Sequence, residues 1–340
     1  MRRARLRAPV EWGVAHYHVV SRVVNRAFVM EETEREQFVK FMRLYERLCG
    51  VRVVTYCVLS NHFHLLVEVP RRPDRPLTEE RLLAVVRRAY GPLRANALAL
   101  ELKQTREMAG EEKARELMAG WEARMWDLSQ FMKTLKQRFT QWFNHRHKRK
   151  GTLWEERFRS SLIEGSAQAL HLVAAYIDLN PVRAGIVEDP KDYRWSGYGA
   201  AVGGGREARA ALRRLMEGNA GRGSGAALAA YRVLLFGVGG EEGVGEDGTP
   251  MRRGFDRDQV REELARGGRL SVEDFLRCRV RYFTDGAAIG SREFVDRVFG
   301  ALRERFGERR GDGARRVRGL AQALYSLRAL KVDPVSAPSG

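Results

Sequence analysis

Two histidines separated by one phenylalanine, His62 and His64, have the spacing that most directly indicates chemistry. The apolar run that follows them is typical of a β-strand. Because side chains alternate between the two faces of a strand, both imidazoles would point one way while Phe63 points into a core. Two imidazoles held side by side are half of a metal site. On spacing alone, a pair of partly exposed polar residues is an equally good interpretation.

Two further His-x-His pairs show that this spacing is not specific by itself. His16 and His18 lie in a predicted strand and could also chelate an ion. His145 and His147 lie at the end of a predicted helix, where residues i and i+2 point about 200° apart and cannot share an ion. Their Lys- and Arg-rich surroundings favour contacts with phosphate.

A predicted helix over residues 166–180 supplies the groups that two imidazoles lack, a nucleophile and a third ligand. Tyr176 and Asn180 are an i, i+4 pair and therefore share one face of this helix. A metal ion next to a phosphodiester would help a tyrosine to attack, because the ion neutralises charge on the phosphate and on the leaving oxygen. The plainer interpretation, which spacing alone favours, is a tyrosine at the edge of the core and an asparagine that caps the helix.

The elements that must position these residues follow the order β-α-β-β-insertion-α-β. Alternating or Val-rich segments predict strands at residues 14–24, 51–58, 62–69 and 152–163. Helical spacing predicts helices at residues 33–49 and 127–145, and a helical insertion at about 71–125. This is the order of the split βαβ unit. We therefore predict an α+β fold, a ferredoxin-like antiparallel sheet with helices on one face and with the first and third strands adjacent at its centre.

Residues 1–200 are predicted to form the first domain. A Gly-rich linker with short helices near residues 206–217 and 226–235 follows over 201–254. A mainly helical carboxy-terminal domain is expected over 255–332, before a tail at 333–340. Residues 275–306 are a candidate helix-turn-helix, and a plain helical support domain is the alternative.

The charge of the chain indicates a polyanionic partner. The 340 residues carry 61 Lys and Arg against 43 Asp and Glu, a net charge of +18. Nucleic acid is the favoured partner, because cations that neutralise phosphates release condensed counterions. The alternative is an Arg-rich soluble protein whose charges cancel locally. Six cations are candidates for the path of a strand: Lys133, Lys136, Arg138, Lys148, Arg149 and Lys150.

Other features bound the compartment. The three cysteines are scattered, which argues against a disulfide framework and favours a reducing, cytoplasmic setting at the nucleoid. No apolar run approaches the roughly 18 residues that a membrane span needs. The basic amino terminus has no apolar stretch behind it, so it is not expected to be a signal peptide.

Three motifs in this order resemble a known family. His62-Phe63-His64, the segment Gly151–Phe158 and the segment Tyr176–Gly185 are similar to those of the HUH endonucleases, and most similar to the REP-associated tyrosine transposases. The resemblance covers about residues 10–200. Minimal members of the family dimerise and some palindrome-associated members act alone, so a homodimer and a monomer both stay open.

The resemblance implies a ferredoxin-like fold that binds single-stranded or hairpin DNA. It implies that Tyr176 attacks a phosphodiester and leaves a 5′-phosphotyrosine, with Mg²⁺ or Mn²⁺ held by His62 and His64. Asn180 falls where relatives place a polar third ligand, often a longer Gln. The predicted function is a metal-dependent transposase-type DNA endonuclease and strand transferase. The alternatives are a non-catalytic nucleic-acid-binding regulator derived from a transposase, and a metal hydrolase that uses water.

Overall fold

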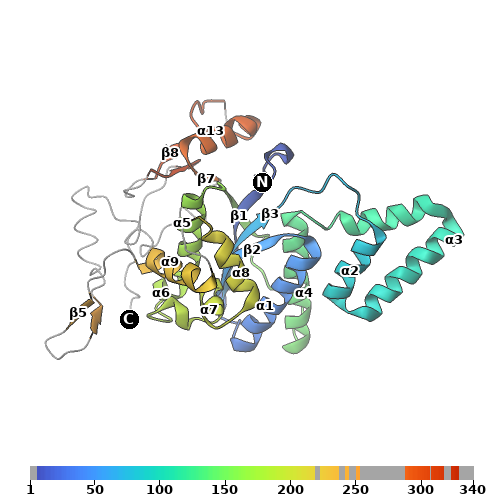
Figure 1. Cartoon of the computed structure of the whole chain (residues 1–340), viewed down its shortest axis with the longest axis horizontal. Helices are drawn as coiled ribbons and strands as arrows, with labels where there is room; N and C mark the ends of the chain where they lie inside the picture. The colour runs from blue at the N-terminus through green and yellow to red at the C-terminus, as the bar shows by residue number, and fades with distance from the viewer. Residues whose placement is uncertain are drawn as a thin grey trace.

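A seven-stranded sheet in the order β2-β3-β1-β4-β7-β9-β8 organises the chain (Figure 1). The computed structural model describes residues 6–218, 223–236, 242–244, 250–252, 288–306, 308–317 and 323–328. The strands of this sheet are β1 (Ala15–Arg22), β2 (Arg52–Val58), β3 (His62–Val69), β4 (Arg159–Ile163), β7 (Ala288–Gly290), β8 (Arg315–Arg316) and β9 (Tyr325–Ser326). The predicted α+β class is confirmed, and the first and third strands are adjacent among the first four.

The pairing of β1 with β3 fixes which side chains share a face. The strands are antiparallel, with Val20 opposite His64 and Arg22 opposite His62. Directly opposed residues project to the same side, so His18, Val20, His62 and His64 lie on one face of the sheet. The predicted fourth strand, 152–163, becomes a strand only from Arg159, because the residues before it form a loop that bridges to the end of β1.

One face of the sheet packs on two helices, α1 (Glu32–Cys49) and α4 (Leu128–Arg146). Phe63 contacts Phe38 of α1 with ring centroids 4.5 Å apart, and Phe38 contacts Phe139 of α4 at 5.2 Å. Trp154 from the loop before β4 lies 5.4 Å from Phe63. The predicted inward orientation of Phe63 is therefore correct.

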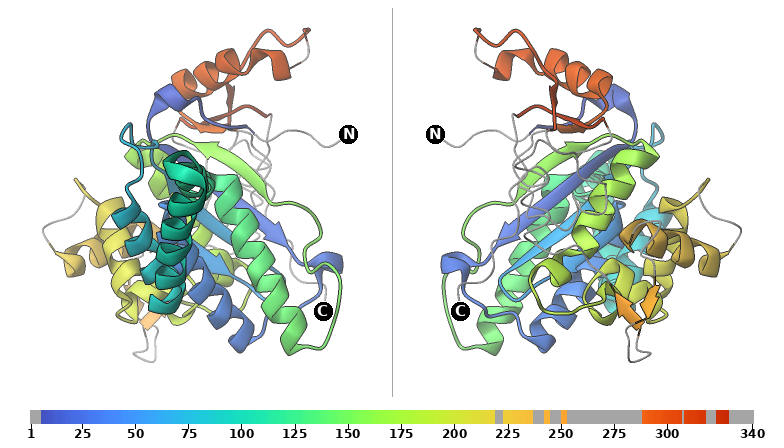
Figure 2. Two further views of the ribbon diagram at one scale, coloured as in Figure 1. Left: turned by 90° about the vertical axis from the view of Figure 1, so that its right-hand side faces the viewer. Right: turned by 90° about the vertical axis from the view of Figure 1, so that its left-hand side faces the viewer.

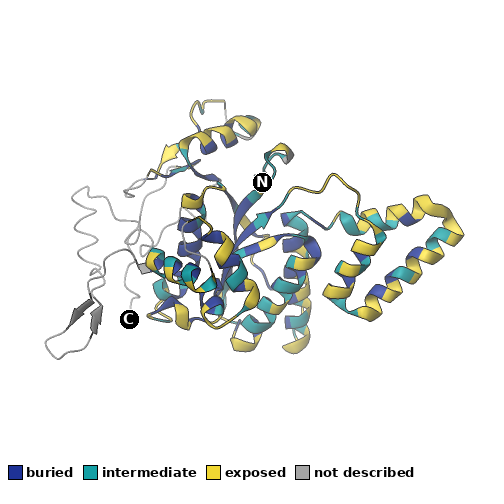
Figure 3. Ribbon diagram, viewed as in Figure 1, coloured by how far each residue is buried: buried dark blue, intermediate teal, exposed yellow. Residues whose placement is uncertain are grey.

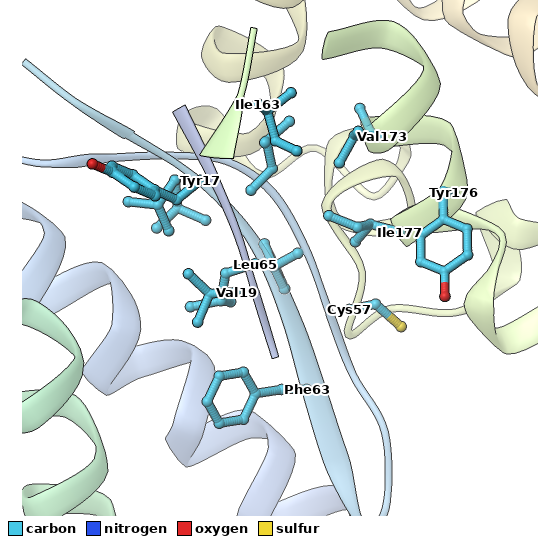
Figure 4. Close-up of a cluster of buried hydrophobic side chains, with 14 of the residues drawn as sticks. Tyr17, Val19, Cys57, Phe63, Leu65, Ile163, Val173, Tyr176 and Ile177 are labelled. Atoms are coloured by element: carbon cyan, nitrogen blue, oxygen red, sulfur yellow. The ribbon is translucent and has the colours of Figure 1, made fainter. Parts of the chain in front are cut away.

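The other face is also covered, which differs from the prediction of helices on one face only. Here α5 (Ala167–Asp178) and α8 (Arg206–Leu215) pack on β2, and α5 also packs on β3 (Figure 2). Figure 4 shows Val173, Tyr176 and Ile177 of α5 across the sheet from Val19 and Phe63. The reason is chemical: this face carries buried apolar side chains such as Val20, Cys57 and Leu66, which need cover as much as those opposite.

The segment predicted as an insertion contains α2 (Glu79–Tyr90) and α3 (Pro92–Glu122), which project from the body as a hairpin (Figure 1). Gly110, with φ +86°, breaks α3 into two straight pieces. Leu82, Leu98 and Leu102 form a small core of the hairpin's own, whereas its outer surface is exposed (Figure 3).

Two helices of the predicted linker pack into the main core. The helices α8 and α9 (Ser224–Phe236) contact each other and α5, and Tyr231 of α9 is completely buried. The Gly-rich composition predicted a linker, but the apolar residues at helical spacing place these two helices in the core. Within the same segment a small hairpin pairs β5 (Glu242–Val244) with β6 (Pro250–Arg252).

The described carboxy-terminal residues extend the sheet and add α13 (Arg292–Ala301). The strand β7 runs parallel to β4, so the sheet is not purely antiparallel. The first helix of the candidate helix-turn-helix and the boundary predicted at residue 254 lie outside the described residues. The remaining helical elements are α6 (Asn180–Arg183), α7 (Gly197–Val202) and 3-10 turns at Val10–Trp12, Val24–Arg26, Pro190–Asp192 and Arg303–Arg305. No helix in the described part of the chain combines the length and apolar character that crossing a bilayer requires.

Candidate active site

Three histidines from two strands meet beneath α5. His18 Nε2 and His64 Nδ1 are 2.9 Å apart and form a hydrogen bond in which one nitrogen donates to the other. The two rings stack with centroids 5.2 Å apart. The contact arises because Val20 stands opposite His64, which makes His18 the diagonal neighbour of His64 on the same face. The ring of His62 lies 5.1 Å from that of His64. The i, i+2 geometry predicted for His62 and His64 is confirmed.

Tyr176 closes this group from the last turn of α5. Its ring lies edge-on to two imidazoles, with centroids 5.8 Å from His18 and 6.0 Å from His64. The tyrosine is only 6% exposed. Figure 4 shows its hydroxyl directed away from the body of α5, on the Cys57 side of the sheet. We call His18, His62, His64 and Tyr176 the histidine–tyrosine cluster.

The turn before β3 determines which nitrogen of His62 is available. Asn61 Oδ1 lies 2.6 Å from His62 Nδ1, and Asn61 Nδ2 donates to the carbonyl oxygen of Arg26 at 3.1 Å. An amide oxygen can only accept, so Nδ1 of His62 carries the proton and Nε2 keeps its lone pair. This is the tautomer that a metal ligand needs, with a hydrogen-bonded partner that orients the ring.

Burial keeps the two candidate ligands neutral. It lowers the pKa of His62 to about 4, with a smaller effect from the positive charge of Arg22. The pKa of His64 is lowered by burial first, then by its neighbours His62 and His18. Neutral imidazoles bind metal ions, so the donors fit a divalent ion. Among the described residues no group of three or more His, Cys, Asp or Glu side chains could hold an ion, so a third ligand would have to be of another kind.

His16, the other histidine of the first strand, does not join the cluster. Its Nε2 lies 3.7 Å from a carboxylate oxygen of Glu68, and burial lowers its pKa to about 4. Of the two histidines of β1, the structure therefore brings only His18 to His64. The sequence left this choice open, because alternation places both on one face and only the register distinguishes them.

Asn180 is one turn beyond Tyr176, and its amide is engaged with the end of the helix. Its Nδ2 donates to the carbonyl oxygens of Tyr176 at 3.1 Å and Ile177 at 3.3 Å. This is the capping contact that the plainer sequence interpretation expects. The role of Asn180 as a metal ligand stays a prediction, for which only its amide oxygen is available.

Arg183 is a member of the site that sequence reasoning missed. Its guanidinium lies over the Tyr176 ring, 4.0 Å from the centroid, and donates to the Tyr176 carbonyl oxygen at 2.7 Å. A signal was present: positions 176, 180 and 183 follow the i, i+4, i+7 spacing of one helix face. The short helix α6 continues directly from α5 and so preserves this alignment.

Asp178 fixes the end of α5 from the side away from the imidazoles. This completely buried carboxylate accepts from Thr55 Oγ1 at 2.8 Å, from the Tyr231 hydroxyl at 2.7 Å and from the Tyr198 amide at 2.9 Å. Burial raises the pKa of Asp178 to about 6, although these donors act in the opposite direction. Elements β2, α7 and α9 thus set the position of the helix that carries Tyr176.

The six cations predicted to contact DNA do not lie with the cluster. All come from α4 or the loop after it, and α4 covers the opposite face of the sheet. Lys136 is buried, and its ammonium donates to the carbonyl oxygen of Glu156 at 2.7 Å, which secures the loop before β4. Its exposed or half-exposed companions are Lys133, Arg138, Lys148, Arg149 and Lys150.

Comparison with known proteins supports the resemblance carried by the motifs. Residues 13–74 match the model of a family described as "Transposase IS200 like". The matched span runs from the start of β1 past the end of β3, so it contains His18, His62 and His64 and ends before Tyr176. The resemblance is confirmed over this span.

A search of solved structures returned a tyrosine transposase associated with REP sequences, bound to a REP hairpin. The two chains are 16% identical in sequence. The match covers 60% of this chain and 87% of the other, with a TM-score of 0.38. No curated protein matched the chain.

Proposed function

We propose that this chain is a transposase-type enzyme that nicks DNA with Tyr176 and rejoins strands through a covalent protein–DNA intermediate. The proposal depends on one observation above all: a tyrosine stands edge-on to two adjacent, buried imidazoles, beside a third whose tautomer leaves the lone pair on Nε2. The family match over the strands that carry these histidines supports the class of reaction.

In the proposed reaction the Tyr176 oxygen forms a bond to phosphorus and the bond from phosphorus to the 3′ oxygen breaks. The tyrosine loses its proton, and the departing oxygen takes one up to become a 3′-hydroxyl. Because one phosphodiester replaces another, the bond energy is retained and strands can be rejoined without a nucleotide cofactor.

The residues of this chain have separable tasks in that reaction. His62 and His64 would hold a divalent ion, which supplies charge neutralisation at the phosphate. Imidazole donors favour Mn²⁺ over Mg²⁺, because Mg²⁺ prefers oxygen ligands. His18 holds the ring of His64, and Arg183 brings a permanent positive charge to the side of Tyr176 where a phosphate would sit.

The proposed substrate is single-stranded or hairpin DNA at the nucleoid. A net charge of +18 supports a nucleic-acid partner. Tyr176 is buried between its helix and the sheet, so the DNA backbone must come close to reach it. An unpaired strand can do this more readily than a duplex can. A homodimer and a single acting chain both stay predictions.

The decisive experiment is detection of the covalent adduct. We would incubate the full chain with a 3′-labelled pool of hairpin oligonucleotides with randomised single-stranded flanks, in Mn²⁺, and separate the products under denaturing conditions. Wild type is expected to give a labelled protein band. Tyr176→Phe is expected to reduce that band by about three orders of magnitude or more, since no other group replaces the nucleophile.

Tyr198→Phe serves as the matched control, because Tyr198 is a buried tyrosine of α7 outside the cluster. Its adduct should stay close to that of wild type. An undiminished adduct in Tyr176→Phe would contradict the nucleophile. Hairpin binding without any adduct, in every metal tested, would favour the non-catalytic regulator, and cleavage that survives loss of Tyr176 would favour a hydrolase that uses water.

A further inference from the structure

A groove lined by cations separates the base of the α2–α3 hairpin from α4. Its volume is about 600 Å³, and it lies between Tyr90, Arg94, Trp121 and Arg124 of the hairpin base and the outward face of α4, which contributes Lys133 and Arg138. We call this the cationic groove. It includes no aspartate or glutamate among its lining residues.

Three arginines of the groove are oriented by contacts with aromatic side chains. Arg124 stacks on Trp121 with its guanidinium 5.0 Å from the ring centroid, and Arg94 approaches the same ring at 5.6 Å. Across the groove, Arg138 donates to the Tyr45 hydroxyl at 3.1 Å. Guanidinium groups oriented in this way lose less entropy when they bind a planar or tetrahedral anion.

The charge of the groove is largely uncompensated. Lys133 makes no ion pair with any residue that the structure describes, and the nearest carboxylate to Arg94, on Glu101, is 4.0 Å away. Four cations around a concave surface with no acid in its lining focus a positive potential, which attracts a polyanion. Three glutamines and a threonine of α4 add neutral groups that can donate to phosphate oxygens or base edges.

The polar face of α4 continues beyond the groove. Lys133, Gln137, Gln141 and His145 form one i, i+4 row along the helix, which leads to the exposed lysines after its end. A linear polyanion could therefore follow the helix, whereas a compact anion would use only part of the surface. Trp121 and Tyr90 provide aromatic surface on which an unpaired base can stack.

We propose that the cationic groove binds a nucleic-acid strand, so that the inserted hairpin gives this chain a second DNA-binding surface away from Tyr176. That the strand is DNA rests on the proposed function. The groove lies on the α4 face of the sheet and the histidine–tyrosine cluster on the α5 face, so the groove holds DNA flanking the reactive phosphate and takes no part in the chemical step.

The test uses two double variants with identical charge changes. Lys133→Glu/Gln137→Glu places two carboxylates in the groove, and Lys103→Glu/Gln104→Glu places two on the exposed outer side of α3. All four positions are exposed, so both proteins should fold, which thermal melting would check. Binding of a labelled DNA hairpin with single-stranded flanks is measured by fluorescence anisotropy over a range of salt concentrations.

The groove variant should raise Kd at least about 10-fold and reduce the slope of log K against log salt by about 1 to 2, since each lost phosphate contact removes about 0.7 to 0.9 from it. The α3 variant should change Kd by no more than about 2-fold, through general charge alone. Equal changes of the Kd for DNA in the two variants would overturn the proposal. The same holds if the groove variant loses binding to poly-glutamate as much as it loses binding to DNA.

Adduct formation at saturating DNA separates this proposal from the proposed function. The groove variant should form adduct at the wild-type rate once DNA is saturating, because the groove acts only on binding. If no protein forms adduct but Kd still shifts in the groove variant alone, the enzyme proposal fails and the groove stands. If adduct forms normally and Kd does not shift, the groove fails and the enzyme proposal stands.

Discussion

The histidine–tyrosine cluster and the cationic groove hold polar groups on opposite faces of one sheet, and they do so in opposite ways. In the cluster His18 and His64 are almost fully buried and bonded to each other, and Tyr176 is covered by the helix that carries it. In the groove Lys133 and Arg138 are exposed and the lining is open to water. The first region is buried, and the second is open to water and positively charged.

In the proposed function this contrast separates two tasks, the chemical step in the cluster and the binding of a strand in the groove. Electrostatic interactions are strong where water is excluded, so each group in the cluster should have a large effect that salt barely changes. Solvated cations act weakly, additively and through counterion release, so groove residues should have small effects that salt removes. Substitutions in the cluster and at residues that contact or position it test whether this separation is real.

Among the residues that support Tyr176, the largest effect is expected for Arg183→Ala. Removal of a fixed charge beside Tyr176 should slow adduct formation about 100-fold at saturating DNA, with little change in the salt dependence of binding. Arg183→Lys should recover part of the rate. Arg194→Ala, which removes an arginine stacked on Trp195, is the matched control. A steep salt-dependent loss in Arg183→Ala would place Arg183 with the groove instead.

A smaller effect is expected for His18→Gln. His18 touches His64 rather than the reacting atoms, so its loss should weaken Mn²⁺ affinity roughly 10- to 100-fold, as loss of partners that orient metal ligands does. Titration of Mn²⁺ by electron paramagnetic resonance would measure this without any reaction. His16→Gln, on the same strand face, should leave the affinity unchanged. Equal affinities in all three proteins would contradict the positioning role of His18.

The smallest effect on the chemical step, and a clear one on stability, is expected for Asp178→Ala. Three buried donors would lose their acceptor, which should lower the free energy of unfolding by roughly 3 kcal/mol. Because burial raises the pKa of Asp178 to about 6, its contribution is full below about pH 4 and falls as pH rises through 6. The stability difference between wild type and variant should therefore narrow from pH 4 to pH 7 in chemical denaturation. If the difference in stability widens with pH, the hydrogen bonds lower the pKa of Asp178 by more than burial raises it.

Local patterns in the amino-acid sequence determine much of this protein by themselves. Alternation predicted the shared face of His62 and His64, and helical spacing predicted the helix that carries Tyr176 and the helices of the insertion. These are properties of short segments, in which the period of the side chains follows from backbone geometry. The ferredoxin-like order of β1 to β4 followed from the order of those segments, and the family match lies within them.

Only the tertiary structure decided which residues meet. His18 and His16 are equivalent in sequence, and the register of β1 against β3 alone brings His18 to His64. The second covered face, the burial of Lys136 and the packing of α9 depend on contacts between distant segments, which sequence spacing does not encode. The cationic groove is the clearest case, because its two walls come from an insertion and from a helix whose cations Lys133 and Arg138 the sequence offered for DNA without showing what lies opposite them. The sequence determines which side chains lie on each face of a segment, and packing determines which of those faces meet.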